Sequence, residues 1–512
     1  MIKSLDIKSG LFLLTGNFYF YKLMKWPNQL NAKRILFYSI IVFILVHIIY
    51  INIPPCSIHV WRQCNTLAVA QNFYEEDLNI LEPRVDRRFE SDGITGTAFP
   101  IYEWLLAIIY KITGVHYWSH RLFSLIITIT ATVFAFLFLK NITSNTIAAS
   151  ITSSLLLWSP EFFYHSINAI PDILALCTGF ISLYYYSKRD RNKFSIVLSL
   201  VFLTLSGLIK MQYLMIGVFH LVEFIKSKFE NRKLVKEDLL IISAGFFCLA
   251  VVYSWYNYSL HLIEQSNLRD FGIEIRSASN LQAAFATLRK NLISDFPELV
   301  FGFANTLVII IGCYASFSKK SNTYLIHFSA LLFIYCVYHF LELRQMDVHH
   351  YYMMPIYFVV IALLYNGVEF LFKKGRYAII LVLLIAQPIL ACIRIIPARW
   401  AKSDLGISQS FSDKSKLEKL KSFIPVDAKI VAGPDESGCI YLYFLHKKGF
   451  GYERANQLSE IKEGKILLES YISRGATYLV TTNASDVTND SLTQYFEKAI
   501  QFNEFYIIQL KK

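Results

Sequence analysis

Three carboxylates near the first long apolar run could act as a general base. Asp86 and Asp92 lie in residues 57–93, the stretch with the densest mix of charges in the chain, and Glu103 follows it. A carboxylate held beside a hydroxyl can take the proton of that hydroxyl when it attacks a second group. A solvated loop charge paired with Arg84 or Arg87 is the alternative interpretation of Asp86.

Ionisable and aromatic residues recur at the ends of apolar runs, where an ionisable group is costly unless it is paired or functional. The candidates are Lys210 in "GLIKMQY", Asp172 at the start of a run, and Arg344, His349, His350 and Tyr351 in "ELRQMDVHHYY". Lys210 could instead extend to lipid headgroups, the two histidines could fill an aromatic belt, and Asp172 is favoured as a structural residue at a helix N-terminus. Together, cations and a carboxylate at membrane depth suit a substrate with a phosphate head and a lipid tail.

Several kinds of site are not indicated. The sequence has no glycine-rich phosphate loop, so neither ATP nor a nucleotide sugar is expected as a ligand. No His/Cys spacing is typical of structural zinc, so no metal site is predicted. The segments "HVWRQ", which contains His59, and "VHH" are the ones that could lend metal ligands, and a divalent metal cofactor is left open.

The elements that position these residues are membrane helices. The chain has 512 residues, of which 54% are hydrophobic and 17% charged, whereas soluble domains carry about 25% charged residues. The apolar runs predict a polytopic α-helical membrane protein with about eleven transmembrane helices. They cover 35–53, 121–140, 144–160, 171–187, 194–209, 211–226, 238–258, 298–317, 323–341, 351–372 and 376–395.

The basic clusters predict the orientation of these helices. With the N-terminal segment 1–34 in the cytoplasm, clusters such as "KRDRNK" and "KKGR" all fall on the cytoplasmic side, as the positive-inside rule requires. The net charge of +12 is therefore attributed to cytoplasmic loops rather than to nucleic-acid binding. Residues 100–114 are too short for a span and are predicted to lie in the outer interface. They belong to a large first outer loop, residues 54–120, within a transmembrane domain of residues 35–399.

The last part of the chain differs in composition. Residues 400–512 contain no apolar run of spanning length and alternate short strand-like and helix-like segments. Strands are expected at 428–433, 476–482 and 504–510, and helices at 416–424 and 465–475. We therefore predict a small extracytoplasmic α/β domain.

Five segments, taken in their order along the chain, resemble the polytopic GT-C glycosyltransferases, in the branch of the protein O-mannosyltransferases and the aminoarabinose transferase of lipid A. They are "GTAFPIYEWLLAIIYKITG" (96–114), "HRLFSLIITITATVFAFLFLK" (120–140), "SPEFFYHSINAIPDILAL" (159–176), "GLIKMQYLMI" (207–216) and "HHYYMMPIYFVVIALL" (349–364). The resemblance covers roughly residues 35–400. It implies a multi-pass protein of the cytoplasmic (inner) membrane whose active site faces the extracytoplasmic side.

The resemblance also implies roles for individual residues. The donor would be a sugar linked to a polyprenyl phosphate, and an acidic residue of the first outer loop would be the base. Asn65 stands where an Asp is expected, so Asp86 is the first choice for this base, with Asp92 and Glu103 as alternatives. Donor phosphate binding would fall to Lys210, His349 and His350, joined by Arg62 and His59.

The predicted function is transfer of this sugar to a hydroxyl of a glycan, glycolipid or protein, with membrane lipid as a further partner. The alternative is a transporter or flippase of a lipid-linked glycan. A transporter would need polar groups along a path through the membrane and repeat symmetry. The ionisable groups instead gather on one predicted face, and no internal repeat is found.

Overall fold

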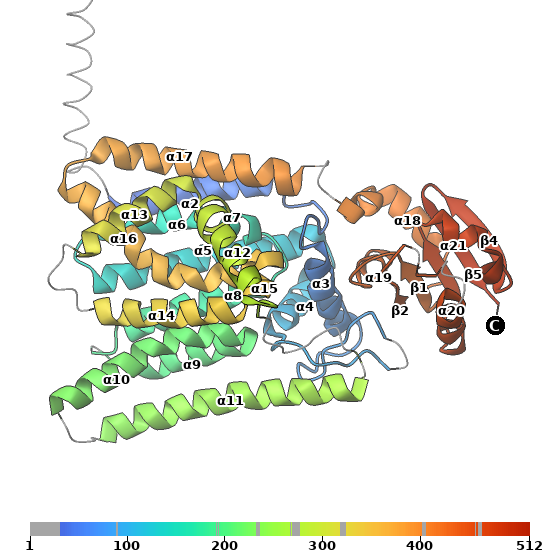
Figure 1. Ribbon diagram of the computed structural model, residues 1–512, viewed down its shortest axis with the longest axis horizontal. Helices are drawn as coiled ribbons and strands as arrows, with labels where there is room; N and C mark the ends of the chain where they lie inside the picture. The colour runs from blue at the N-terminus through green and yellow to red at the C-terminus, as the bar shows by residue number, and fades with distance from the viewer. Residues whose placement is uncertain are drawn as a thin grey trace, which may run out of the picture.

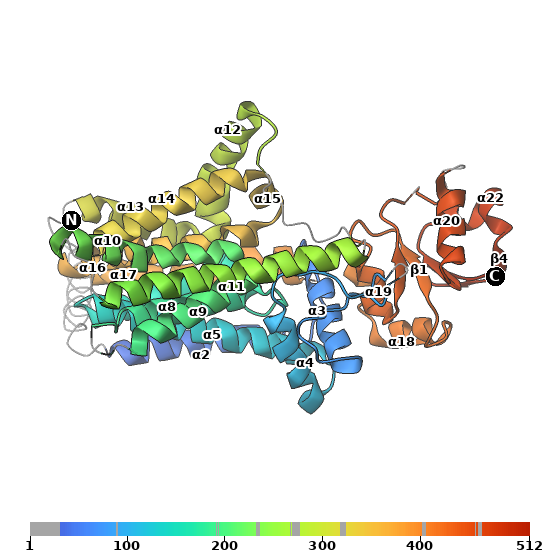
Figure 2. The same cartoon turned by 90° about the horizontal axis from the view of Figure 1, so that it is seen from below.

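The computed structural model describes residues 31–88, 91–190, 192, 194–231, 236–266, 268, 277–317, 324–401, 406–455, 457–458 and 463–511. Nearly all of the predicted cytoplasmic segment 1–34 lies outside these residues. A bundle of long helices runs along the longest axis, and a small domain with a β-sheet adjoins one end of the bundle (Figure 1). The short helices α3 (Val60–Glu75) and α4 (Ile101–Thr113) lie at that end, beside the small domain (Figures 1 and 2).

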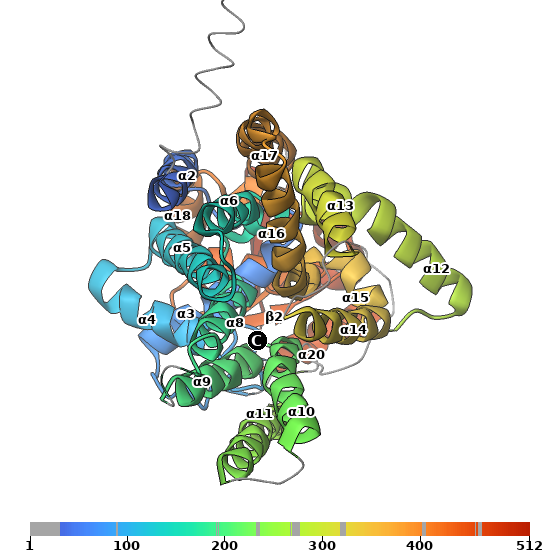
Figure 3. The same ribbon diagram turned by 90° about the vertical axis from the view of Figure 1, so that its left-hand side faces the viewer.

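The helices of the bundle coincide with the predicted apolar runs. They are α2 (Ala32–Ile48), α5 (Tyr117–Ile142), α6 (Thr146–Leu157), α8 (Asp172–Tyr186), α9 (Phe194–Ile209), α10 (Val218–Asn231), α11 (Lys236–Ser266), α13 (Phe303–Phe317), α14 (Leu325–Leu341), α16 (Tyr357–Lys373) and α17 (Tyr377–Ile395). Seen nearly end-on, α10 and α11 lie at the rim of the bundle, and α12 (Leu281–Lys290) projects from its side (Figure 3).

Small residues allow close approach within the bundle. A Cβ atom on Gly312 of α13 would lie 1.9 Å from the carbonyl oxygen of Leu363 in α16. A Cβ atom on Gly367 of α16 would lie 2.2 Å from the carbonyl oxygen of Val308 in α13. The two helices therefore touch backbone to backbone, as small residues permit in membrane helices.

The predicted count of about eleven spans is not confirmed. Among the described residues, three helical stretches are long and apolar enough to cross a membrane, namely Tyr117–Ile142, His350–Lys373 and Tyr377–Trp400. A fourth would be the pair Leu281–Val300 and Phe303–Phe317, which is bent by 116°. Other predicted runs form helices of 12–17 residues, below the roughly 20 residues that a bilayer core requires.

Helix α4 confirms the helix expected at 100–114. It ends at Gly114, whose φ of +74° lies in the left-handed region that favours glycine. Helix α3, by contrast, was not predicted, because it mixes polar and apolar residues and carries no apolar run. All of its residues from Gln63 to Phe73 are nevertheless buried, since α3 lies between α4 and the C-terminal domain.

The C-terminal domain is built on a five-stranded sheet with strand order β2-β1-β3-β5-β4. Its strands are β1 (Ile430–Gly433), β2 (Gly449–Gly451), β3 (Tyr478–Thr481), β4 (Phe496–Phe502) and β5 (Phe505–Leu510). Strand β1 pairs in parallel with β2 and β3, whereas β5 pairs antiparallel with β3 and β4. Strands β1, β3 and β5 match the prediction, and so do helices α18 (Lys414–Ser422) and α20 (Glu463–Ser473). The sequence did not indicate β2, which is only three residues long, or β4, which is largely exposed.

Backbone contacts join this domain to the predicted first outer loop. The Gly449 N–H donates to the Asp86 carbonyl oxygen at 3.0 Å, and the Arg88 N–H donates to the Gly449 carbonyl oxygen at 2.9 Å. The Cys439 thiol, just before α19 (Ile440–Leu445), donates to the Trp61 carbonyl oxygen at 3.5 Å. The C-terminal domain therefore packs against α3.

Candidate active site

Glu103 is a buried carboxylate surrounded by other charges. It lies in the first turn of α4 and is 6% exposed. Its Oε2 atom has no hydrogen-bond partner among the residues that the structure describes. Burial raises the pKa of Glu103 to about 7, with nearby Arg62 and Lys210 opposing the rise and Asp172 adding to it. A carboxyl group with this pKa can exchange a proton at neutral pH.

Lys210 and Asp172 form an ion pair close to Glu103. Lys210 lies at the break between α9 and the 3-10 helix Met211–Gly217, and Asp172 is the first residue of α8. The Lys210 Nζ atom is 3.6 Å from Asp172 Oδ2. Neither carboxylate oxygen of Asp172 has a hydrogen-bond partner within the described part of the chain, although the side chain is fully buried. The helix N-terminus stabilises this charge, so the structural role favoured from the sequence and a role in the site are both compatible with the geometry.

Aromatic rings continue the site from Lys210 towards α3. The Lys210 Nζ atom lies 5.0 Å from the ring centre of Tyr352 and 5.8 Å from that of Tyr351, within reach of a cation–π interaction. The Tyr351 ring stacks on His349 with ring centres 5.5 Å apart, and His349 is 5.4 Å from the Trp61 ring. The structure therefore places predicted residues from distant segments of the chain next to one another.

The other two first-loop carboxylates lie elsewhere. Asp86 is 5% exposed, and its Oδ1 atom accepts from Lys448 Nζ at 2.6 Å and from Asn72 Nδ2 at 3.0 Å. The side chain of Asp92 is 60% exposed and accepts a hydrogen bond from the Ile94 N–H at 3.1 Å. Asp86 is thus neutralised by the C-terminal domain, and Asp92 is a solvated loop charge.

The remaining predicted residues differ in their surroundings. Arg62, in the first turn of α3, is half-buried, and Arg344 is exposed on the short helix α15 (Leu343–Val348). His59 is fully buried beside Tyr351, with ring centres 5.0 Å apart. His350 is half-buried, and Glu161, Asp295 and Arg399 contribute to its electrostatic environment.

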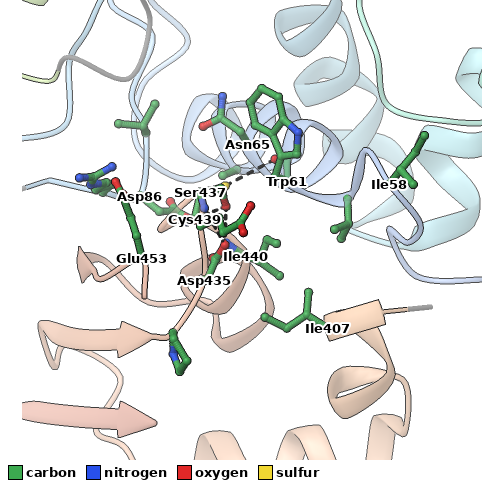
Figure 4. Close-up of a pocket in the computed structure, with 16 residues that line it drawn as sticks. Ile58, Trp61, Asn65, Asp86, Ile407, Asp435, Ser437, Cys439, Ile440 and Glu453 are labelled. Atoms are coloured by element: carbon green, nitrogen blue, oxygen red, sulfur yellow. Dashed lines mark hydrogen bonds between the residues drawn. The ribbon is translucent and has the colours of Figure 1, made fainter. Parts of the chain in front are cut away.

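A cavity of about 600 Å³ lies between α3 and the C-terminal domain (Figure 4). Trp61 and Asn65 face it from α3, and Asp435, Ser437 and Cys439 face it from the opposite side (Figure 4). Asp86 lines the same cavity, with Glu436 and Glu453. Of these residues, sequence analysis singled out only Asp86 as a functional candidate. The others face a common cavity only because two distant segments of the chain pack against each other.

Sequence analysis also missed Glu161 and His165. Both are fully buried on α7 (Pro160–His165), and His165 Nε2 lies 2.7 Å from Glu161 Oε1. Their spacing of four residues places them on one helix face, which is a signal that the sequence contained. Together with His59 they are the described residues that could hold a metal ion.

Residues 97–257 match the family model of the dolichyl-phosphate-mannose-protein mannosyltransferases. A comparison with curated protein sequences finds no match. Among solved structures, the chain resembles ArnT from Cupriavidus metallidurans bound to undecaprenyl phosphate, with a TM-score of 0.57, 9% identity, and coverage of 91% of this chain and 97% of that one.

ArnT in the apo state gives a TM-score of 0.51 at 10% identity, with the same coverage. The oligosaccharyltransferase of Archaeoglobus fulgidus in the apo form gives 0.52 at 11% identity, over 93% of this chain and 74% of that one. Together with the three described stretches that are long and apolar enough to cross a membrane, these matches support a membrane location. They also confirm the predicted resemblance: the chain has the fold of the polytopic GT-C glycosyltransferases.

Proposed function

We propose that this protein is a membrane glycosyltransferase that moves a sugar from a polyprenyl-phosphate donor to a hydroxyl group of a glycan, glycolipid or protein. One observation carries the proposal. A buried carboxyl group with a pKa near neutrality, Glu103, lies among the cations of Arg62 and Lys210 in a chain with the GT-C fold. Acid–base chemistry and phosphate binding are the two functions that such a transfer requires.

The donor phosphate is assigned to the cationic side of this cluster. Lys210 and Arg62 supply positive charge, and Tyr351 and Tyr352 offer aromatic surface next to Lys210. As the bond between the anomeric carbon and the phosphate oxygen breaks, the phosphate gains negative charge. Cations held in a buried site stabilise that charge more in the transition state than in the ground state. Undecaprenyl phosphate bound to ArnT, a chain of the same fold, supports this donor class.

Glu103 is assigned the role of base in place of Asp86. In the reaction, the acceptor oxygen forms a bond to the anomeric carbon, its proton passes to Glu103, and the polyprenyl phosphate leaves with the electron pair of the broken bond. Glu103 has an oxygen without a hydrogen-bond partner among the described residues, whereas the Asp86 carboxylate is held by Lys448. A base needs a free oxygen at the reacting hydroxyl, and Glu103 Oε2 supplies one.

The cavity between α3 and the C-terminal domain is assigned to the acceptor. Its volume of about 600 Å³ lies within the usual range for small-molecule sites. Trp61 offers an aromatic face, and the acidic residues Asp86, Asp435 and Glu453 offer acceptors for sugar hydroxyls. Trp61 also contacts His349 of the donor side, so one residue of α3 borders both regions.

The proposed orientation places this end of the bundle on the extracytoplasmic side of the inner membrane. The connection between α16 and α17, which contains "KKGR", lies at the end of the bundle opposite the C-terminal domain (Figure 1). Basic loops remain in the cytoplasm during insertion, which supports an extracytoplasmic C-terminal domain.

Transfer can be tested with the purified full chain in lipid nanodiscs. A radiolabelled polyprenyl-phosphate sugar is supplied with a membrane glycolipid extract as acceptor, and labelled glycolipid and free polyprenyl phosphate are both measured. We expect release of polyprenyl phosphate that depends on acceptor and is lost in Glu103→Gln. Movement of the intact donor between leaflets without cleavage would instead establish the flippase.

A further inference from the structure

Two buried cysteines, Cys64 and Cys439, lie at the contact between α3 and the C-terminal domain. Cys64 is fully buried, Cys439 is 9% exposed, and both are free thiols. Cys439 immediately precedes α19 and lines the cavity of about 600 Å³. Its thiol donates to the Trp61 carbonyl oxygen of α3 at 3.5 Å. The Cys439 sulfur therefore lies directly against the backbone of α3.

Helical spacing places Cys64 on the part of α3 that Cys439 contacts. Trp61, Asn65 and Ala68 line the cavity, and a spacing of three or four residues puts side chains on one face of a helix. Cys64 follows Trp61 by three residues and belongs to the same face. A short side chain in an α-helix reaches the carbonyl oxygen three or four residues before it. The carbonyl oxygen that Cys439 contacts is therefore also within reach of the Cys64 side chain.

The surroundings of the Cys64 thiol agree with this placement. Burial raises the pKa of Cys64 well above its ordinary value, and the Cys439 thiol makes the largest of the further contributions to this rise. Cys56 makes a smaller contribution. It also belongs to a different contact, because its thiol donates to the Arg399 carbonyl oxygen at 3.6 Å. Cys439 is therefore the favoured partner of Cys64.

The turn that carries Cys439 is held by its own hydrogen bonds. Ser437 Oγ donates to Asp435 Oδ1 at 2.7 Å and lies 3.1 Å from Cys439 Sγ. The Cys439 N–H donates to Ser437 Oγ at 3.3 Å, and the Ile440 N–H donates to Asp435 Oδ2 at 2.6 Å. The position of the Cys439 sulfur beside α3 is therefore fixed by the fold of the C-terminal domain.

We propose that Cys64 and Cys439 close to a disulfide that links α3 covalently to the C-terminal domain. The proposal rests on the proposed extracytoplasmic orientation, because disulfides persist in oxidising compartments and are rare in the cytoplasm. The bond requires Cα atoms about 4.4–6.8 Å apart and a sulfur–sulfur distance of about 2.0 Å. With the Cys439 sulfur against the α3 backbone one turn from Cys64, rotation of the two side chains is the movement that bond formation requires.

The bond forms by exchange with the disulfide of a thiol oxidoreductase of that compartment. The Cys439 thiolate attacks one sulfur of this disulfide, which gives a mixed disulfide and releases the other sulfur as a thiolate. The Cys64 thiolate then attacks the Cys439 sulfur and releases the second thiolate of the oxidoreductase. The two cysteines lose two electrons and two protons in total, and the oxidoreductase gains them. Because burial keeps Cys64 protonated in the docked chain, we expect this exchange while the C-terminal domain is docking.

The disulfide acts on the same contact as the ion pair of Asp86 with Lys448. Cys439 borders the cavity assigned to the acceptor, so the bond fixes the distance between the two sides of that cavity. Linking residues 64 and 439 also removes extended conformations from the unfolded chain, which favours the folded one. The C-terminal domain is then unable to separate from α3 until the bond is reduced.

The disulfide is tested on the full chain extracted from membranes without reductant. Free thiols are blocked with N-ethylmaleimide in denaturant, and the peptides of an unreduced digest are identified by mass spectrometry. We expect a peptide pair joined through Cys64 and Cys439 in most chains, which separates after reduction. Cys177 and Cys392 are internal controls, because they lie in α8 and α17 and should carry the blocking group.

Blocked Cys64 and Cys439 in the unreduced chain would overturn the proposal, and so would a peptide pair joined through Cys56 and Cys64. This measurement uses the wild-type chain, so it does not depend on the folding of a variant.

A second measurement tests the effect of the bond on the domain contact. Reduction should speed proteolysis between α17 and α18 at least about twofold in the wild type, because it removes the cross-link. The double variant Cys64→Ala/Cys439→Ala should not respond to reductant, whereas the matched control Cys392→Ala should respond as the wild type does. An equal response of the double variant and the wild type would overturn this role of the bond.

The disulfide and the transferase proposal fail separately. A joined peptide pair from a chain without sugar transfer removes only the transferase. Sugar transfer by a chain in which both thiols are free removes only the disulfide.

Discussion

Two carboxylates from the same predicted loop are both buried, yet they have opposite surroundings. Asp86 is held by Lys448 and Asn72 at the contact with the C-terminal domain. Glu103 keeps one oxygen without a hydrogen-bond partner among the described residues, and its pKa is raised by burial to about 7. Burial by itself therefore does not distinguish a structural acid from a reactive one.

The difference lies in what compensates the charge. The Asp86 carboxylate is paired with an ammonium group and joins two segments of the chain, and its Oδ1 atom is occupied by these contacts. The Glu103 carboxylate has Asp172 as well as cations among its neighbours, and burial outweighs the cations, so its protonated form is populated at neutral pH. Such a group is expected where a proton is exchanged, and this is the reason for assigning the base to Glu103.

A substitution of Glu103 is the most direct test of this difference between the two carboxylates. Glu103→Gln removes the proton acceptor but keeps the size of the side chain, so we expect kcat to fall about 10²–10⁴-fold. Donor binding should be retained, as measured by equilibrium binding of the labelled donor. Asp86→Asn is the comparison variant: it alters the lining of the acceptor cavity, so we expect KM for the acceptor to rise and kcat to fall less than in Glu103→Gln. A greater loss of kcat in Asp86→Asn than in Glu103→Gln would reverse the assignment.

Lys210 tests the cationic half of the site. Lys210→Met removes the charge near the phosphate and leaves Asp172 buried without its ion-pair partner. We expect a loss of about 10²–10³-fold in kcat/KM, comparable to the loss of one group that stabilises a developing oxyanion. Lys210→Arg, which keeps the charge, should recover part of this loss. Equal activity of the Met and Arg variants would show that Lys210 serves packing instead.

Lys448 tests the structural role of Asp86. Lys448→Met should leave Asp86 buried without its cation and weaken the contact between the C-terminal domain and the bundle by about 1–3 kcal/mol. The expected result is faster proteolysis between α17 and α18, with a lower Tm. The double variant Asp86→Asn/Lys448→Met should be less unstable than the sum of the single variants, because it leaves no unpaired charge. Additive effects would show that the two side chains are energetically independent.

The pH dependence tests the protonation state of Glu103. Below a pKa of about 7 the carboxyl group is protonated and cannot accept a proton. The rate should therefore rise about tenfold per pH unit up to pH 7 and level off above it. Initial rates with saturating donor measure this profile. Glu103→Gln should abolish the step at pH 7, and a step that persists in this variant would belong to another group.

The smallest effect is expected at Asp92. Its carboxylate is exposed and accepts a local hydrogen bond, so Asp92→Asn should change the free energy of unfolding by less than about 0.5 kcal/mol. Transfer should stay within about twofold of the wild type, in the same assay. A large loss of transfer would place Asp92 at the acceptor and would require the loop to adopt another arrangement during the reaction.

Much of the candidate site was accessible from the sequence because ionisable residues near apolar runs are rare and costly. This reasoning found Lys210, Asp172 and the 349–351 segment, which the structure brings close together. It ranked Asp86 above Glu103, because Asp86 lies in the core of the first outer loop beside Arg84. Lys448, whose ammonium group donates to Asp86, is more than 350 residues away in the chain.

The C-terminal domain was accessible to a similar extent. Short strand-like runs identified β1, β3 and β5, since the residue types of such runs are local properties of the chain. The three residues of β2 form no such run, and only pairing with β1 defines them as a strand.

The sequence by itself determined that this is a membrane protein of helices with a small α/β domain, because hydropathy and periodicity depend on neighbouring residues. It also determined which residues are unusual for their surroundings. Only the tertiary structure decided which carboxylate is paired, where the cavity lies, and that His59 meets Glu161 and His165. These properties depend on contacts between distant segments, and the same side chain has a different pKa and a different role according to the partner that packing places beside it.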